Sequence, residues 1–210
     1  LHTISRRQRQ MCIRDRNPLG YHFSQMKVSD LCLMNQNGEL VYGKERTGDA
    51  AQSIHSNIYK SRSDINAVAH AHPMYGKTFS TLNKELKPIT QDSCAFYKRT
   101  ATFTDYDGVA NGPDEGINIA KALAEKDFLI LQNHGILTTG TMVETTLWYF
   151  LNMEEACKSQ LLAEAVGEPI VIPDKVAIHT RDYVANDLSA FASIQPLLDV
   201  LWEKEPEFLD

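Results

Sequence analysis

The sequence lacks any long hydrophobic run. Its uncharged apolar stretches, such as Ile170–Ile172 and Phe128–Leu131, are far shorter than the roughly 20 residues that a membrane-spanning helix needs. It also lacks the glycine-rich patterns GxxxxGK and GxGxxG, so nothing in it indicates a nucleotide site. Hydrophobic residues make up 43% and charged residues 23% of the 210 positions, which is typical of a folded protein with a full core. We therefore expect no membrane partner.

Cysteine is scarce and never closely spaced. Cys12, Cys32, Cys94 and Cys157 lie far apart, with no CxxC pair, so the sequence does not indicate a disulfide framework. Reduced, partly buried thiols are typical of proteins from a reducing compartment, and we predict a cytoplasmic location. Only Cys94 lies in a polar segment, QDSCAFY. No basic residue adjoins it to activate a thiolate, so a nucleophilic role is disfavoured.

Basic residues are outnumbered, 21 against 27 acidic ones, and they are unevenly placed. Residues 1–16 hold five arginines and one aspartate, and the rest of the chain carries a net charge of −10. A surface that acidic repels phosphate backbones, so we expect no nucleic-acid partner. The run RRQRQMCIRDR resembles translated adaptor sequence. We interpret residues 1–16 as a non-native or disordered segment, with a flexible native tail as the alternative, and residues 17–210 as a single domain.

Hydrophobic periodicity and turn signals predict alternating strands and helices, and therefore an α/β fold. Asn37-Gly38 predicts a tight turn between two strands. The predicted strands span residues 28–35, 39–42, 67–71, 128–132 and 136–139. The predicted helices span residues 49–62, 113–126 and 142–166, and a C-terminal helix from about residue 179 is expected to break at Pro196.

Three histidines form the main candidate site. His70 and His72 are two residues apart on a predicted strand, so their imidazoles project from the same face. His134 follows another predicted strand, beside Gly135, a glycine that lets the backbone turn tightly. If the two strands are neighbours, the three rings can converge on one divalent ion and leave a fourth position open, as in catalytic metal sites. The alternative is a set of surface histidines.

The segments RSDINAVAHAH and LQNHGILTTG resemble the class II aldolase/adducin family, over roughly residues 17–166. The resemblance implies a three-layer α/β/α sandwich around a mainly antiparallel central sheet. It also implies a homotetramer with sites at the subunit junctions. In the family's sugar-phosphate aldolases three histidines hold zinc, and the matching positions are His70, His72 and His134. Three imidazoles also suit Mn²⁺ or Fe²⁺.

The sequence departs from the family pattern at several positions. Family aldolases carry an acid/base glutamate that also binds the metal, and that position falls on Ala51, which cannot transfer a proton. The phosphate-binding serines fall near Asp49 and Ala50, and a carboxylate beside a phosphate argues against a sugar-phosphate substrate. Asp49 could instead be solvated or replace the missing carboxylate. The adaptor-like residues stand where the family has a further helix and strand, so we expect an N-terminally truncated chain.

The segment QDSCAFY resembles a subgroup of the family that lacks the glutamate, and it supplies two candidate catalytic residues. Asp92 could orient a ligand histidine or act as a base, and Tyr97 could polarise a substrate. The alternatives are a loop cap for Asp92 and a core aromatic for Tyr97.

Three functions fit these features. The favoured one is a metal-dependent lyase acting on a small carbonyl or carboxylate substrate by aldol cleavage or decarboxylation. Without the glutamate, decarboxylation is easier to explain than aldol cleavage, because loss of carbon dioxide generates a carbanion without a base. The alternatives are an iron-dependent oxygenase on the same histidines and a non-catalytic, adducin-like assembly domain.

Overall fold

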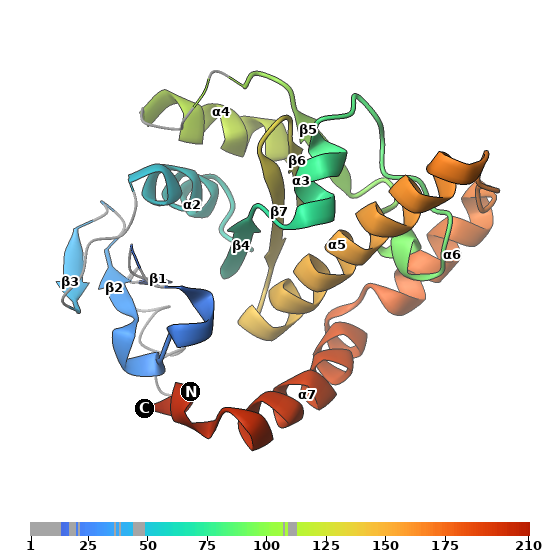
Figure 1. Ribbon diagram of the computed structural model, residues 1–210. Helices are drawn as coiled ribbons and strands as arrows, with labels where there is room; N and C mark the ends of the chain where they lie inside the picture. Colours follow the sequence, from blue (N-terminus) through green and yellow to red (C-terminus); the bar gives the residue numbers. More distant parts are fainter. Residues whose placement is uncertain are drawn as a thin grey trace. The chain divides into compact units, whose positions relative to one another are not determined.

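The computed structural model describes residues 14–16, 20, 22–35, 37, 39–43, 49–106, 108 and 113–210 (Figure 1). The chain divides into two compact units. One comprises residues 1–62, 109–118 and 197–210, and the other comprises residues 63–108 and 119–196. The expected single domain over residues 17–210 stays a prediction.

The first unit contains a small antiparallel sheet in the order β1-β2-β3. Its strands are β1 (Arg14–Arg16), β2 (Cys32–Met34) and β3 (Leu40–Tyr42), and 3-10 turns occur at Phe23–Gln25 and Val28–Asp30. The pairing of β2 with β3 confirms the predicted hairpin, although its first strand is shorter than expected. The side-chain oxygen of Asn35 accepts hydrogen bonds from the backbone N–H groups of Asn37 and Glu39 and so closes the turn.

Strand β1 is formed by the last three residues of the segment that we set aside as non-native or disordered, and it pairs with β2. Residues 1–13 lie outside the described part of the chain. The origin of that segment stays a prediction.

Helix α2 (Asp49–Ser61) agrees with the predicted helix over residues 49–62. Ile54 and Ile58, one turn apart, are both buried, whereas Ala51 is exposed in the first turn. Helix α4 (Pro113–Leu123) begins in the same unit, where a Cβ atom on Gly116 would lie 2.6 Å from the carbonyl oxygen of Ser53. The two helices therefore approach closely at this glycine.

The second unit is built on a four-stranded sheet in the order β4-β7-β6-β5. The strands are β4 (Ala67–Ala71), β5 (Thr100–Phe103), β6 (Phe128–Leu131) and β7 (Gly135–Gly140). The pairs β4–β7 and β7–β6 are antiparallel, but β5 and β6 are parallel. Parallel neighbours need a crossover connection, and α4 lies in the one between β5 and β6. The predicted mainly antiparallel sheet is thus only partly confirmed.

Helices α3 (Met74–Ser80) and α5 (Val143–Val166) pack against this sheet (Figure 1). The core between them is a cluster of buried apolar side chains that includes Phe79, Phe128, Ile130, Ile136, Tyr149 and Met153. Every residue of β6 is buried, so both faces of this strand are covered, as in the central layer of a three-layer sandwich.

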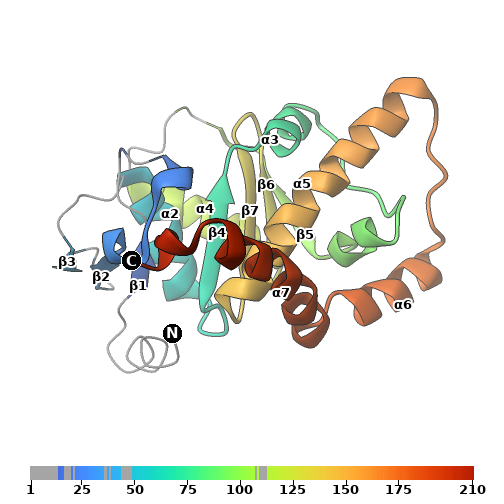
Figure 2. The same cartoon turned by 60° about the horizontal axis from the view of Figure 1, so that its bottom comes forward.

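The C-terminal region forms two helices, α6 (Asp174–Val184) and α7 (Asp187–Lys204), and a final 3-10 turn, Pro206–Leu209. Figure 2 shows the extended connection from α5 to α6. The predicted break at Pro196 is wrong, because α7 continues through this residue. The break falls at Asn186, whose side chain accepts from the Ser189 N–H and donates to the Tyr183 carbonyl, and so caps both helices.

Among the helices that the structure describes, none has the length and apolar character needed to cross a membrane.

Helix α4 also ends earlier than predicted, at Leu123 rather than near Lys126. Ala124 has a φ of 47°, in the left-handed region, and this conformation terminates a helix.

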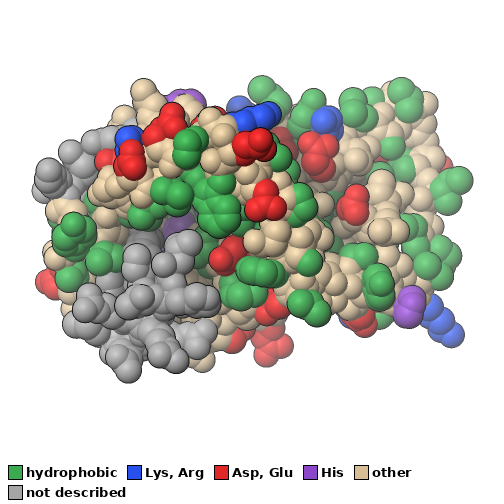
Figure 3. Space-filling model, turned by 90° about the horizontal axis from the view of Figure 1, so that it is seen from below, with side chains coloured by type: hydrophobic (Ala, Val, Ile, Leu, Met, Phe, Trp, Pro, Cys, Tyr) green, Lys and Arg blue, Asp and Glu red, His purple; other side chains and the backbone are tan. Residues whose placement is uncertain are grey.

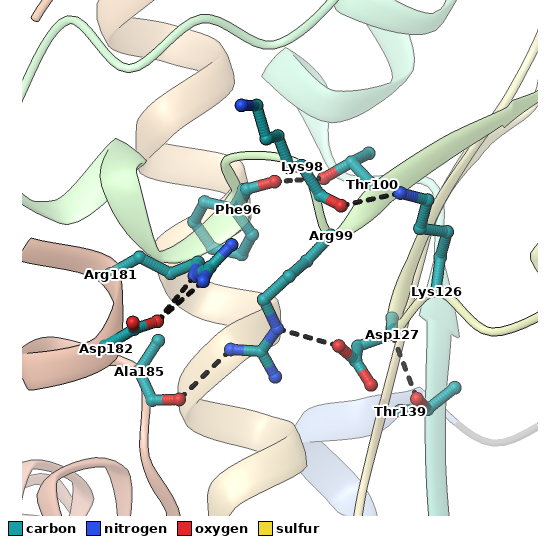
Figure 4. Close-up of polar contacts among 10 residues, drawn as sticks. All are labelled: Phe96, Lys98, Arg99, Thr100, Lys126, Asp127, Thr139, Arg181, Asp182 and Ala185. Atoms are coloured by element: carbon teal, nitrogen blue, oxygen red, sulfur yellow. Dashed lines mark hydrogen bonds and ion pairs between the residues drawn. The ribbon is translucent and has the colours of Figure 1, made fainter. Parts of the chain in front are cut away.

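Arg99, directly before β5, joins the sheet to the junction of α6 and α7 (Figure 4). Its Nε donates to the Asp127 carboxylate at 2.7 Å, and its Nη1 donates to the carbonyl of Ala185 at 3.0 Å. The guanidinium also lies 4.9 Å and 5.3 Å from the ring centroids of Phe128 and Tyr149. This network therefore holds the C-terminal helices at the end of the sheet where β5 and β6 begin.

Candidate metal centre

Three histidines meet where β4 ends and β6 turns into β7. His70 belongs to β4, His72 follows it, and His134 lies in the turn after β6. Because Ala71 is the register partner of Ile136 on β7, the end of β4 lies beside that turn. The three ring centroids are 4.6–5.2 Å apart. One nitrogen from each ring lies within 4.8 Å of the other two, so the predicted convergence is confirmed.

The backbone of the Asn133-His134-Gly135 turn differs from our expectation. The left-handed conformation belongs to Asn133, with a φ of 57°, and not to Gly135. A Cβ atom on Gly135 would lie 2.6 Å from the carbonyl oxygen of Ala71 and 3.1 Å from Cδ2 of His72. Glycine is required here for close approach of the strands rather than for conformational freedom.

The orientation of His70 is set by a backbone hydrogen bond. Its Nδ1 lies 2.9 Å from the carbonyl oxygen of Ile136. A carbonyl oxygen can only accept, so Nδ1 carries the proton and Nε2 keeps its lone pair. A second ring nitrogen held in this way is the usual arrangement in histidines that bind metals.

The electrostatics of the cluster favour neutral imidazoles. Burial, with smaller contributions from His134 and His72, lowers the pKa of His70 to about 4, against the opposing effect of the Ile136 carbonyl. Loss of solvent also lowers the pKa of His72, with a smaller contribution from Lys77. The pKa of His134 is lowered by burial and then by His72. All three rings are therefore neutral near pH 7, which is the state that binds a metal.

Tyr106 is a residue of this region that the sequence analysis missed. Its ring centroid lies 6.3 Å from that of His134, and 43% of the residue is exposed. It follows β5, which runs parallel to β6, so both strands end at the edge where His134 lies. A prediction of strand β5 and of its pairing would have found it.

The structure does not bring Asp92 and Tyr97 to the histidines of the same chain. Both lie before the first residue of β5, whereas Tyr106 and His134 follow the opposite ends of β5 and β6. Asp92 is exposed in a 3-10 turn, Asp92–Phe96. The hydroxyl of Tyr97 donates to Asp174 on α6 at 2.8 Å. Their catalytic roles stay a prediction, which this arrangement within one chain does not support.

The described cysteines are buried thiols outside any disulfide: Cys32, Cys94 and Cys157. Burial raises the pKa of Cys94, and the charge of Asp92 raises it further. Burial raises the pKa of Cys157 to about 12, with a contribution from Glu154. Cys94 and Cys157 therefore stay protonated at neutral pH, and neither is an activated nucleophile.

Comparison with known proteins agrees with this geometry. Residues 3–161 match the family described as Class II Aldolase and Adducin N-terminal domain. The chain belongs to the class II aldolase/adducin family.

Three known proteins are similar to this chain. "Decarboxylase NovR" of Streptomyces niveus is 36% identical over 192 residues, which cover 91% of this chain and 71% of that protein. The "4-hydroxy-3-prenylphenylpyruvate oxygenase/4-hydroxy-3-prenylbenzoate synthase" of Streptomyces roseochromogenus subsp. oscitans is also 36% identical over 192 residues, covering 91% of this chain and 69% of that protein. The structure of L-fuculose 1-phosphate aldolase from Glaciozyma antarctica PI12 superposes with a TM-score of 0.86 at 37% identity, over 94% of this chain and 78% of that one.

Proposed function

We propose that this protein is a divalent-metal-dependent carbon–carbon lyase that acts on a small carbonyl or carboxylate substrate, with decarboxylation favoured over aldol cleavage. The observation that carries the proposal is the convergence of three neutral imidazoles at one edge of the sheet. Membership of a family that includes aldolases supports it, as does a relative named a decarboxylase.

In this proposal His70, His72 and His134 hold the ion, most suitably Zn²⁺, with Mn²⁺ or Fe²⁺ as alternatives. Their nitrogens lie within 4.8 Å of one another, which is close enough for all three to bind one divalent ion. A divalent ion bound there polarises a substrate carbonyl and stabilises the negative charge that develops beside it.

The chain's own residues favour decarboxylation. Ala51 stands where the family aldolases have their acid/base glutamate, so this position cannot remove a proton from the substrate. Loss of carbon dioxide needs no such base, because the electron pair of the broken bond stays on the substrate carbon. That carbon then needs a proton. We assign its delivery to Tyr106, whose phenol lies beside His134.

The proposal is tested by elemental analysis of anaerobically purified protein. We expect near-stoichiometric metal in the wild type and its loss in His70→Ala. The control is His179→Ala, which alters an exposed histidine on α6 and should keep the metal. Release of carbon dioxide from a panel of 3-keto acids, whose carbonyl can take up the electron pair of the broken bond as an enolate, then identifies the substrate class. A wild type without metal would contradict the proposal and favour an adducin-like assembly domain.

An iron-dependent oxygenase is the second candidate, since the Streptomyces roseochromogenus relative is named an oxygenase. A face of three histidines with open positions suits Fe²⁺. Oxygen uptake that requires Fe²⁺ and a keto- or hydroxy-acid substrate would favour this function. Carbon dioxide release without oxygen consumption would favour the lyase.

We further propose that the protein is a cytoplasmic homotetramer. The buried thiols agree with a reducing compartment. Val143, Leu147 and Leu151, four residues apart on α5, are 70%, 36% and 41% exposed, and they form an apolar stripe. Hydrophobic side chains also appear among acidic ones on the face shown in Figure 3. Burial of such surfaces between subunits is the expected reason for assembly.

A further inference from the structure

Helix α3 begins two residues after His72 and has no capping side chain of its own. Its N-cap residue is Pro73, which has no side-chain oxygen to accept a hydrogen bond from the helix. The first intrahelical bond runs from the N–H of Lys77 to the carbonyl of Pro73. The N–H groups of the first turn therefore need acceptors from elsewhere in the fold.

Glu154 of α5 supplies those acceptors. Its Oε1 accepts from the N–H of Tyr75 at 2.8 Å, and its Oε2 accepts from the N–H of Gly76 at 2.5 Å. A carboxylate at the positive end of a helix makes charge-assisted hydrogen bonds, which are among the stronger ones in proteins. One side chain thus holds the first turn of α3 from a helix nearly 80 residues later in the sequence.

The same turn also contacts the strand that orients His70. A Cβ atom on Gly76 would lie 2.9 Å from Cγ2 of Ile136, so α3 packs directly on β7. The carbonyl of Ile136 accepts from Nδ1 of His70. The first turn of α3 is therefore linked to His72 along the chain, and to His70 through Ile136.

We propose that Glu154 is a positioning residue of the three-histidine centre. By fixing the first turn of α3, its carboxylate fixes the short backbone segment between β4 and α3, which contains His72. It also fixes the position of the Ile136 backbone that orients His70. It acts through these groups and does not itself bind the ion. This inference rests on the proposed function, in which the histidines hold a metal. The competing explanation is a helix cap that stabilises the fold and leaves the metal site unaffected.

Binding of Co²⁺ distinguishes the two explanations, because affinity and visible absorption both report on the ligand geometry. The test variants are Glu154→Gln and Glu154→Ala. The matched control is Glu164→Gln on the same helix, where the carboxylate accepts from Lys84, Lys87 and Gln160. We expect the Co²⁺ dissociation constant to rise about 10- to 100-fold in Glu154→Ala, the range seen for residues that orient metal ligands. Glu154→Gln should show a smaller rise. Both should shift the absorption bands, and Glu164→Gln should match the wild type.

The inference is overturned if the Glu154 variants unfold at a lower temperature but bind Co²⁺ with the affinity and spectrum of the wild type. An equal loss of affinity in Glu164→Gln would also overturn it, because general weakening of α5 would then explain the effect. If Glu154→Ala does not fold, Glu154→Gln decides. Failure of the wild type to bind Co²⁺ is a different result, because it contradicts the proposed metal centre itself.

Discussion

Gly135 lies where β7 begins, directly against the end of β4, and it has no room for a side chain. In Gly135→Ala the new Cβ would meet the backbone carbonyl of Ala71 at 2.6 Å, so the strands must separate. We expect a loss of about 1–3 kcal/mol in the free energy of unfolding, as for other overpacked positions, together with weaker Co²⁺ binding. Urea unfolding and a Co²⁺ titration measure the two effects.

The control is Gly167→Ala, at the end of α5, where no atom lies within 4 Å of the new Cβ and the backbone is extended. Its stability and metal affinity should match the wild type. Equal behaviour of the two variants would contradict the close-approach explanation.

Also at the residue scale, the pKa of His70 makes the stability of the metal-free protein depend on pH. Burial lowers this pKa to about 4, from an ordinary value of 6.5 that the unfolded chain retains. Above pH 6.5 the ring is neutral in both states and makes no contribution. Between pH 6.5 and 4 the unfolded state binds the proton and the native state does not, so the native state loses stability, by up to about 3 kcal/mol.

Urea unfolding in EDTA at pH 7.5, 5.5 and 4.5 measures this loss. His70→Asn should lose less stability than the wild type over the same interval, while His72 and His134, whose pKa values are also lowered, keep part of the dependence. Parallel profiles for wild type and variant would show that His70 does not titrate as derived.

At the scale of the elements, Arg99 connects the start of β5 with the junction of α6 and α7. Arg99→Met keeps an apolar stem, but it removes the ion pair with Asp127 and the hydrogen bond to Ala185. The ion pair is roughly one-quarter exposed, at 24% and 30%, so we expect a loss of about 1–3 kcal/mol. Thermal and urea unfolding test this, and Co²⁺ affinity should not change, because the histidines lie at the other end of the strands.

Arg181→Met is the matched control, since Arg181 pairs with the neighbouring Asp182, which is 60% exposed. Its loss should stay below about 1 kcal/mol, as for other surface pairs. A change in Co²⁺ affinity in Arg99→Met would contradict the separation between this network and the metal centre.

The element boundaries that were predicted correctly depend on local signals. Pro73 stops β4 after Ala71, and Gly167 ends α5. The boundaries that were predicted wrongly lie at residues that are compatible with more than one local backbone conformation. Asn186 caps two helices, and Pro196 is accommodated inside α7.

At the scale of the whole molecule, we expect assembly through the apolar stripe on α5. Replacing Leu147 and Leu151 by glutamate puts two charges on surfaces that a subunit interface would bury, so the tetramer should dissociate into smaller species. Light scattering coupled to size-exclusion chromatography measures the mass.

Val176→Glu provides the control, because Val176 is 52% exposed on α6, away from the stripe. It should remain tetrameric. A wild type that elutes as a monomer, or a double variant that stays tetrameric, would contradict assembly through this surface.

The sequence by itself determined the local features of this protein. It determined the α/β class, the hairpin, helices α2 and α5, and the placement of His70 and His72 on one face of β4, because periods of two and 3.6 residues and turn residues act over short distances. Only the tertiary structure decided which groups surround those histidines. The parallel pairing of β5 with β6 placed Tyr106 beside His134 and left Asp92 and Tyr97 at the other end of the strand.

The Ile136 carbonyl contacts His70 from 66 residues away in the sequence, and Glu154 contacts the first turn of α3 from 78 and 79 residues away. Contacts of that length have no periodic signature, because the packing of whole strands and helices against one another selects them.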